Sequence, residues 1–424
     1  MLLRSHLLNQ SALNRSCRIL HTGDWHLGKR LDDFSRLEEQ HIVMNEICEI
    51  ANSEDVDIVV VAGDLFDSFN PPIEAVELFY KTFKRLTNGG QRPVVAIAGN
   101  HDSPDRIEAP DPLARECGII FAGYPNSVVP LFELETGLKV IRSEKGFIEL
   151  QLPRKSFPVR ILLTPYTNEY RLKSYLGSED SEAELRNVLQ EKWQLLCNSF
   201  CDNNGVNILV SHLFVIKNGG PVPEEPEDEK PILHIGGAQA IYSENIPNQI
   251  QYSALGHLHR MHKVDDSQSP VYYSGSPISY SFSEANQKKY VVLVDVTPGE
   301  IANVREVQLT TVRPLLRKRA YGVEEALEWL NDNSNALVEL TLVTDSFITA
   351  KDRRMLNAAH NGIVTIIPEV QNSDSFEDNN RNQIDLTQDM ESLFTKYFTQ
   401  IKGQSPNDDI MNLFREILAE EDEE

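Results

Sequence analysis

The chain has 424 residues, of which 41% are hydrophobic and 25% charged, and its formal net charge is −24. Because one hydrophobic core rarely serves a chain of this length, two or three folded units are expected. The negative charge excludes a protein that holds nucleic acid by bulk electrostatic attraction alone, although metal ions or a local basic patch could still bind it. No apolar run approaches the ~18–20 residues of a membrane span, so no membrane association is expected.

Strands and helices alternate at the beginning of the chain. Apolar, β-branched runs at 18–22, 56–62 and 93–98 predict strands, and apolar residues at helical spacing cover 37–52 and 71–86 between them. This alternation predicts parallel strands with the helices outside. A helix is predicted at 181–200. Further strands are predicted at 118–122, 159–164, 206–210, 251–255, 271–273 and 290–296.

The pattern restarts near Arg305, with strands predicted at 304–310, 337–343 and 363–367 and helices at 323–331 and 349–359. An apolar stripe then predicts an amphipathic helix that must bury one face: Met390, Leu393, Phe394, Tyr397, Phe398 and Ile401. The expected organisation is a disordered extension at 1–16, a large unit at 17–300, a small α+β unit at 301–370, a linker at 371–385, and helices with an acidic tail at 386–424.

The five cysteines form no CxxC pair and lie mostly in apolar periodic segments: Cys17, Cys48, Cys117, Cys197 and Cys201. Reduced thiols in a cytoplasmic protein are therefore expected.

Five apolar runs end in side chains that bind metals. The fragments are Asp24-Trp25-His26, Gly63-Asp64, Gly99-Asn100-His101-Asp102, Ser211-His212 and Gly256-His257-Leu258-His259. Parallel strands deliver such residues to one edge of their sheet. A single histidine in such a place is more often structural, so the inference depends on all five fragments together. Their oxygen and nitrogen donors suit two transition-metal ions, with Asp64 as the natural bridge.

The ordered pattern D-x-H, G-D-x-x-D, G-N-H-D, H and G-H-x-H resembles the calcineurin-like metallophosphoesterase superfamily. The resemblance implies an α/β fold in which a β-sandwich is flanked by helices (αββα), and two divalent ions that activate a water to attack phosphorus. It assigns one ion to Asp24, His26, Asp64 and His259, and the other to Asp64, Asn100, His212 and His257. His101 would be the general acid, and the Asp67 carboxylate would orient it.

Longer stretches, at 19–28, 62–67, 254–260 and 273–277, resemble the SbcD family of bacterial nuclease subunits from about residue 17 to the end, although Gly23 stands where that family usually has Ser. The resemblance implies a manganese-dependent 3′–5′ exonuclease on duplex DNA and an endonuclease on single strands or hairpins. It places the protein in DNA repair, replication and recombination, in the cytoplasm near the nucleoid. It also implies an SbcC-like ATPase partner docked on the terminal helices, and a homodimer, through helices near 72–86 and 105–116, within a heterotetramer.

In that family the small unit is a capping domain that embraces DNA. The candidate DNA contacts there are Arg313, Arg317, Lys318, Arg319, Lys351, Arg353 and Arg354, and nearer the metals they are Lys29, Arg30 and Arg36. A solvated charged face is an equally good interpretation of the cluster at 317–319. Two other functions stay open: a phosphatase or nucleotide phosphodiesterase for small substrates, and a non-catalytic scaffold that tethers DNA.

Overall fold

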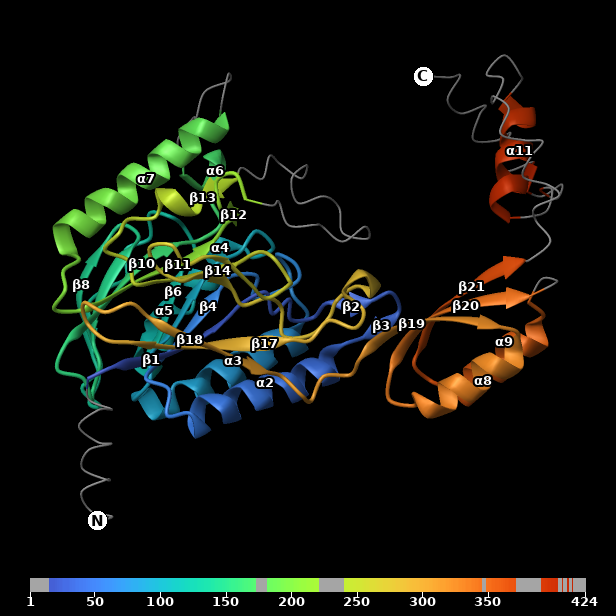
Figure 1. The fold of residues 1–424 in the computed structure, drawn as a ribbon, viewed down its shortest axis with the longest axis horizontal. Coiled ribbons are helices and arrows are strands. Elements are labelled where there is room, and N and C mark those ends of the chain that lie inside the picture. The colour runs from blue at the N-terminus through green and yellow to red at the C-terminus, as the bar shows by residue number, and fades with distance from the viewer. Residues whose placement is uncertain are drawn as a thin grey trace, which may run out of the picture.

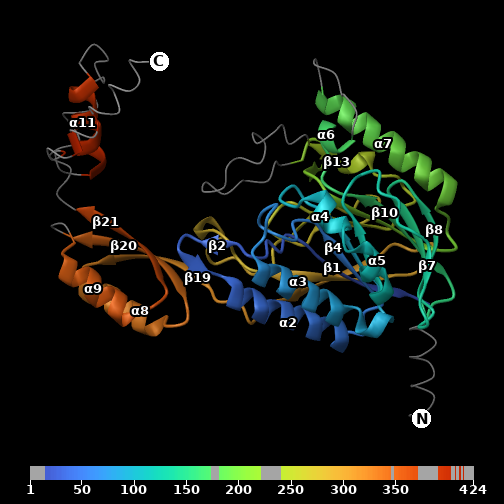
Figure 2. The ribbon, with the colours of Figure 1, turned by 180° about the vertical axis from the view of Figure 1, so that it is seen from behind.

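The structure is a computed structural model that describes residues 15–172, 181–220, 240–344, 348–370 and 390–402, together with 406, 410, 411 and 414. A large unit contains most of the strands, a smaller unit lies beside it, and helix α11 (Met390–Lys402) lies beyond the smaller unit (Figure 1; Figure 2 gives the opposite view). The predicted extension at 1–16, the acidic run at 224–229, the linker at 371–385 and the acidic tail fall almost wholly outside the described residues.

Two sheets form the large unit. The first has the order β18-β17-β1-β4-β5-β6, in which β1, β4, β5 and β6 are parallel. The second has the order β15-β16-β14-β11-β10-β9-β8-β7, with β10, β11, β14 and β16 parallel. The first sheet comprises β1 Cys17–Thr22, β4 Ile58–Ala62, β5 Val94–Ile97, β6 Ile119–Ala122, β17 Tyr290–Val296 and β18 Asn303–Gln308. The second comprises β7 Phe132–Glu133, β8 Lys139–Glu144, β9 Phe147–Gln151, β10 Pro158–Thr164, β11 Val206–His212, β14 Tyr252–Gly256, β15 His262–Asp265 and β16 Val271–Tyr273.

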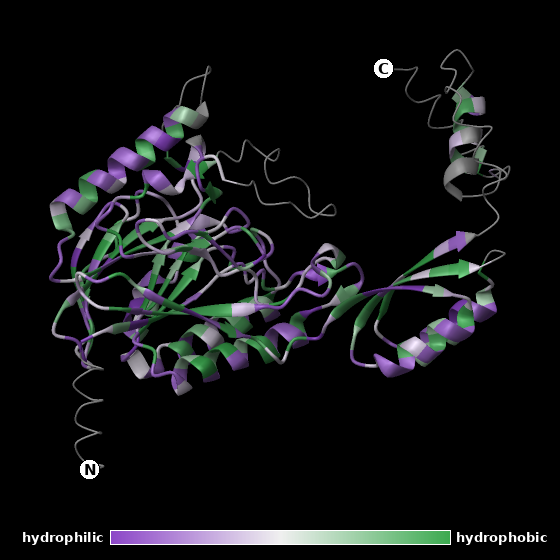
Figure 3. Cartoon of the chain, viewed as in Figure 1, coloured by the Kyte–Doolittle hydropathy of each residue, from purple (hydrophilic) through white to green (hydrophobic). Residues whose placement is uncertain are grey.

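Strand β4 shows why the sheets stack as they do. Successive side chains of a strand point to opposite faces, so Ile58 and Val60 enter the core between the two sheets, while Val59 and Val61 pack under α2 (Leu37–Ser53) and α3 (Ile73–Leu86). Helix α7 (Ser181–Phe200) covers the outer face of the second sheet. Figure 3 shows the strands mostly hydrophobic and the outer helices mixed along their length. The layer order is helix, sheet, sheet, helix, which confirms the predicted αββα fold.

Short elements complete the large unit. They are β2 Arg30–Leu31, β3 Phe34–Ser35, η1 Asn88–Gly90, α4 Pro104–Glu108, α5 Asp111–Ala114, η2 Arg115–Cys117, α6 Glu169–Leu172, β12 Val215–Ile216, β13 Ile241–Tyr242, η3 Ser243–Asn245 and η4 Phe282–Glu284. The five cysteines are free, three of them buried, as expected for reduced thiols.

The small unit, which we call the capping unit, alternates strands and helices. Its wholly parallel sheet β19-β20-β21 consists of Leu315–Tyr321, Leu337–Thr344 and Ile363–Val370. Helices α8 (Val323–Asp332) and α9 (Ala350–Ala359) pack on one face through a small apolar core that includes Leu330, Leu340 and Leu356. A second small cluster joins the capping unit to the large unit: Leu31, Phe282, Leu315 and Leu337.

The boundary between the units differs from the predicted one at 300/301. The strand expected to begin the second unit is β18, which pairs antiparallel with β17 and so forms the edge of the first sheet. The true first strand of the capping unit is β19. Strand β19 was not predicted from the sequence, because Arg317, Lys318 and Arg319 are consecutive in it and obscure the alternation of apolar and polar residues in a half-buried strand. Strands β7, β8 and β9 were also missed.

Of the helices in the part of the chain that the structure describes, none combines the length and the apolar character needed to span a bilayer.

Candidate metal centre

The loops that carry the candidate ligands leave the strands in an unusual backbone conformation. Asp24, His26, Asp64 and His257 all have positive φ, at 51°, 41°, 49° and 110°. Residues other than glycine rarely adopt such φ angles. These angles persist only where the surrounding structure enforces them, often at functional sites. Here the two loops hold each other in these conformations, because the Asp24 and His26 N–H groups donate to the carbonyls of Gly63 and Asp64, each at 2.9 Å.

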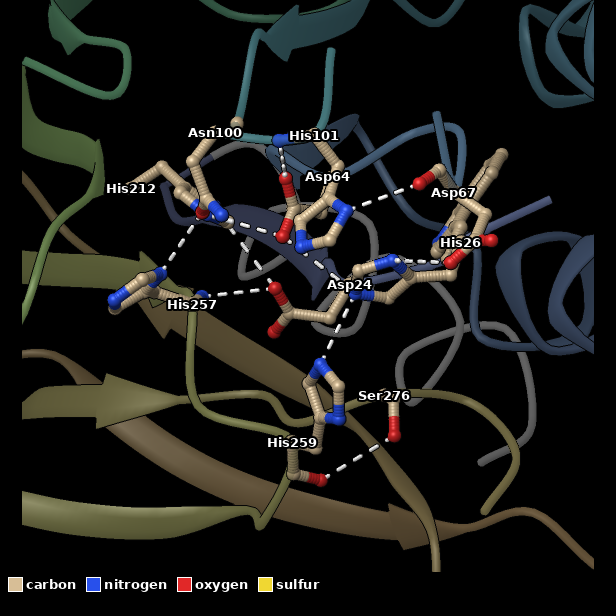
Figure 4. A network of polar contacts seen from close by, with 12 residues as sticks. Asp24, His26, Asp64, Asp67, Asn100, His101, His212, His257, His259 and Ser276 are labelled. Carbon is tan, nitrogen blue, oxygen red and sulfur yellow. Dashed lines mark hydrogen bonds and ion pairs between the residues drawn. The ribbon is translucent and has the colours of Figure 1, made fainter. Parts of the chain in front are cut away.

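The edges of the two sheets also approach too closely for ordinary side chains. A Cβ on Gly256 would lie 1.8 Å from the carbonyl oxygen of Ala62, and one on Gly63 would lie 2.3 Å from Nδ1 of His212. Glycine at these two places therefore lets the loops of both sheets meet. The four fragments from β1, β4, β11 and β14 and the one after β5 converge there (Figure 4).

Asp64 lies at the centre of the converging groups. Its Oδ1 accepts a hydrogen bond from the His101 N–H at 2.9 Å. Its Oδ2 lies 3.5 Å from Nε2 of His26 on one side and 3.4 Å from Nε2 of His212 on the other. Asp64 is accordingly common to two groups of candidate metal ligands, His26–Asp64–His101 and Asp24–Asp64–His212.

Asp24, His26 and His259 form one half of the centre. The Nε2 atoms of His26 and His259 face each other at 3.0 Å. Asp24 Oδ1 accepts the His257 N–H at 2.8 Å, whereas its buried Oδ2 has no hydrogen-bond partner among the described residues. A buried carboxylate oxygen without a partner is rare, and a bound cation would account for it.

Asn100, His212 and His257 form the other half. His212 donates from Nδ1 to the carbonyl of Ala62 at 2.7 Å, which turns its Nε2 toward Asn100 Oδ1 at 2.9 Å. Nδ1 of His257 lies 3.0 Å from the same amide oxygen. A histidine whose outer nitrogen is fixed by a carbonyl is the usual arrangement of a metal ligand.

The pKa shifts of the buried groups are consistent with a site that binds cations. Burial raises the pKa of Asp24 to about 7, although His212 and His259 act in the opposite direction. Burial lowers the pKa of His26 to about 4 and of His257 to about 3, so both rings are neutral and able to coordinate at neutral pH. Burial would also raise the pKa of Asp64, but His212 and His26 hold it well below its usual value. Divalent cations would remove the cost of the buried carboxylates, and the donor set suits them.

Comparison with known proteins decides the family. Residues 17–261 match the family model described as calcineurin-like phosphoesterase. The chain is 35% identical over 418 residues, 96% of its length and 99% of the relative's, to the SbcD subunit of the nuclease SbcCD from Bacillus subtilis. The chain belongs to the SbcD family of calcineurin-like phosphoesterases. Proteins of the same name from Rhodobacter capsulatus and Staphylococcus epidermidis are 33% and 27% identical over 72% and 95% of this chain, and 72% and 100% of their own lengths.

All seven predicted metal ligands of this SbcD-family chain thus meet at one place, while the role of each stays a prediction. His101 lies beside them, its ring 4.9 Å from that of His26 between centroids. Its predicted pairing with the Asp67 carboxylate is not what the structure has. His101 Nδ1 donates instead to the main-chain carbonyl of Asp67 at 3.0 Å, because the carboxylate is engaged by Lys29 at 3.1 Å and faces His26.

Asp102 and Arg171 hold the loop that carries Asn100 and His101. The buried Asp102 carboxylate accepts the N–H groups of Gly99, Leu65 and Phe66 at 2.8 to 3.0 Å. Arg171, which the sequence analysis missed, donates to the carbonyls of Gly99 and Asp102 at 2.7 and 2.9 Å. No sequence pattern connects Arg171 with that loop.

The first metal loop is supported from its other side. Gln40 donates to the carbonyl of His26 at 2.9 Å, and the Tyr280 hydroxyl donates to the carbonyl of Trp25. Trp25 is fully buried and donates to Thr22 Oγ1 at 2.9 Å, so it packs beneath the loop and is not exposed to DNA.

Proposed function

We propose that the chain is the DNA-cleaving subunit of an SbcCD-type complex, a metal-dependent hydrolase of phosphodiesters. It would act as a 3′–5′ exonuclease on duplex ends and as an endonuclease on single strands or hairpins. The observation that carries the proposal is the position of Asp64 Oδ2 between two sets of metal-binding side chains, in a chain whose relatives are named nuclease subunits. DNA repair, replication and recombination in the cytoplasm, near the nucleoid, are the processes we assign to it.

Two divalent ions, which we expect to be manganese, would be held by Asp24, His26, Asp64 and His259, and by Asp64, Asn100, His212 and His257. When bound, they supply an activated water and neutralise charge on the phosphate. The neutral Asn100 limits the negative charge of the site, so a phosphodiester can approach. His101 donates a hydrogen bond from Nδ1 to the Asp67 carbonyl, so its Nε2 is the free position of the ring. The doubly protonated ring would deliver the Nε2 proton to the leaving oxygen and keep the Nδ1 proton in its hydrogen bond.

The basic residues suggested as DNA contacts differ in their availability. Arg36 is fully buried and donates to Glu39 and to the Ser279 carbonyl, so it cannot touch DNA. Arg260, which was not among the suggested contacts, directly follows His259 and is exposed. Arg30 is also exposed, four residues beyond His26. We therefore assign the backbone contacts nearest the metals to Arg30 and Arg260.

Two apolar surfaces support the proposed assembly. On α3 and α5, Ile73 and Leu113 are about three-quarters exposed, and Tyr80 lies on the face of α3 that carries Ile73. We assign this surface to a homodimer. On α11, Tyr397 and Met390 are exposed and Phe394 stacks on Phe414. We assign this helix to docking on the SbcC-like ATPase, because exposed apolar side chains on an amphipathic helix mark interaction sites.

A nuclease assay with manganese tests the proposal. The purified chain, alone and with its cognate ATPase and ATP, should cleave blunt duplexes and hairpins, and should hydrolyse bis-p-nitrophenyl phosphate faster than p-nitrophenyl phosphate. Preference for the monoester with no cleavage of DNA would indicate a small-substrate phosphatase. DNA binding with no hydrolysis of any substrate would indicate a scaffold. Either result would contradict the proposal.

A further inference from the structure

The metal ligand His259 is fixed by a buried polar network on the side away from the other ligands. Lys289 donates from Nζ to the His259 carbonyl at 3.1 Å and to Ser276 Oγ at 2.9 Å. The Ser276 N–H donates to the same carbonyl at 3.1 Å. The Ser276 hydroxyl donates to it as well, at 3.4 Å, and this is the contact drawn in Figure 4. These hydrogen bonds fix the main chain at His259. They do not fix the orientation of its imidazole ring, which requires a contact to the ring itself.

Glu284 faces the ring itself. Its Oε1 lies 3.6 Å from Nδ1 of His259, on the opposite side of the imidazole from the Nε2 that meets His26. Oε1 also accepts the Tyr280 N–H at 3.0 Å, and Oε2 accepts a hydrogen bond from Lys289. Metal-binding histidines commonly have a carboxylate at their outer nitrogen, which fixes the ring and increases its basicity.

The Glu284 carboxylate and its partner Lys289 are both buried, so folding must remove both charges from water. Glu284 is 1% exposed and Lys289 is 4% exposed. A buried ion pair gives little net stability compared with apolar residues of the same size, because desolvation of both charges offsets their attraction. Its presence beside a ligand is therefore better explained by what it does to His259 than by what it adds to folding.

The element that carries Glu284 also contacts the capping unit. Glu284 is the last residue of η4, and Phe282, the first, packs against Leu315 of β19 and Leu337 of β20. Asn286, just beyond η4, donates its N–H to the Leu315 carbonyl at 3.3 Å. One short turn thus has an apolar contact with the capping unit at one end and a carboxylate against a metal ligand at the other.

We propose that Glu284 is a positioning residue for His259, and that η4 makes the placement of this ligand depend on the contact between the large unit and the capping unit. A shift of the capping unit against Phe282 would move Glu284 and change how strongly the ion beside His259 is held. The ion at Asn100, His212 and His257 has no such connection through η4. The inference depends on the proposed metal centre.

Calorimetric titration of the full-length chain with Mn²⁺, followed without any nuclease assay, tests it. Wild type should bind two ions. Glu284→Gln should weaken one ion by about 10- to 100-fold and leave the other unchanged. Phe282→Ala should weaken the same ion by several-fold. The matched control is Glu149→Gln, which breaks another buried ion pair of the large unit, with Arg160 at 3.0 Å, and should bind both ions as wild type does.

Each outcome separates the alternatives. Wild-type affinity for both ions in Glu284→Gln, or an equal loss in Glu149→Gln, would overturn the positioning role. Unchanged affinity in Phe282→Ala would overturn the link to the capping unit. If Glu284→Gln does not fold, Glu284→Asp keeps a buried carboxylate for Lys289 but shortens the side chain away from the His259 ring, and should show the same loss for one ion. A wild type that binds no ion contradicts the proposed function instead.

Discussion

The metal centre and the surface of the capping unit are both rich in charge, but their charges are balanced differently. At the metal centre, Asp24 and Asp64 are buried, and Asp24 Oδ2 has no hydrogen-bond partner among the described residues. On the capping unit, Arg317 pairs with Glu339 at 2.7 Å, Lys318 pairs with Glu325 at 2.6 Å, and Arg319 pairs with Glu369.

The difference shows where a ligand is needed. A buried carboxylate whose pKa is raised by desolvation lacks positive charge, and a cation can supply it. Exposed arginines that are already paired with glutamates need no further negative charge, so they attract a phosphate backbone only weakly. The sequence left two interpretations of the cluster at 317–319, a DNA contact and a solvated charged face. The ion pairs favour the solvated charged face. The following changes would break or sharpen this contrast.

The largest effect is expected at Asp64. Asp64→Asn removes the charge shared by the two sets of ligands, so both ions should bind more weakly. Cleavage should fall by more than the roughly 100-fold that a supporting residue typically costs. Glu339→Gln, the matched change on the capping unit, should leave Mn²⁺ binding unaltered by calorimetry. Equal losses in the two variants would remove the contrast.

His101 should separate catalysis from metal binding. His101→Gln should lower the cleavage rate by about 10²- to 10⁴-fold, because the proton donor is lost, while two Mn²⁺ ions still bind. Asp67→Asn should cost less than about 10-fold, since the main-chain carbonyl of Asp67, which the variant keeps, holds the ring. Single-turnover cleavage rates at saturating Mn²⁺ measure both. A larger loss in Asp67→Asn than in His101→Gln would restore the carboxylate pairing expected from the family.

These two residues illustrate what a sequence can and cannot predict. The meeting of the candidate ligands was predictable because β-branched runs such as 58–62 are buried on both faces, and their ends must meet at one edge. The bond from His101 to a main-chain oxygen was not, since side-chain identity says nothing about which carbonyl lies nearby. Arg171 and Glu284 act on segments distant in the chain, so neither periodicity nor spacing marks them.

We expect His21 to contribute to the acid sensitivity of the metal-free large unit, together with the buried His26 and His257. The His21 ring lies in the interior, bonded to the Tyr252 hydroxyl at 2.8 Å and the Leu255 carbonyl at 3.1 Å, and burial lowers its pKa from 6.5 to about 3. Between these values the unfolded chain binds a proton that the folded chain does not. The stability that depends on this ring is therefore complete above pH 6.5 and decreases as the pH falls, by roughly 2 kcal/mol down to pH 5.

Chemical denaturation of the metal-free protein at several pH values measures this dependence. His21→Gln should be less stable at pH 7.5 but should show a shallower decrease toward pH 5. His41→Gln, on the exposed side of α2, should keep the wild-type slope. An unchanged slope in His21→Gln would show that other groups cause the acid sensitivity.

The smallest effect is expected on the capping unit. Arg317→Gln/Arg319→Gln should leave the free energy of unfolding nearly unchanged, because exposed ion pairs contribute little. DNA affinity should also change little. Arg260→Gln, beside the metals, should weaken DNA binding and reduce its salt dependence by about one phosphate contact. Fluorescence anisotropy over a salt series distinguishes them, and a larger loss in the capping variant would reverse the assignment.

The central claim is that Asp64 joins two cations. Anomalous diffraction from crystals soaked in Mn²⁺ measures this directly. Two peaks about 3.5 to 4 Å apart are expected, one on each side of the Asp64 carboxylate. A single peak, or two peaks away from the seven ligands, would contradict the account.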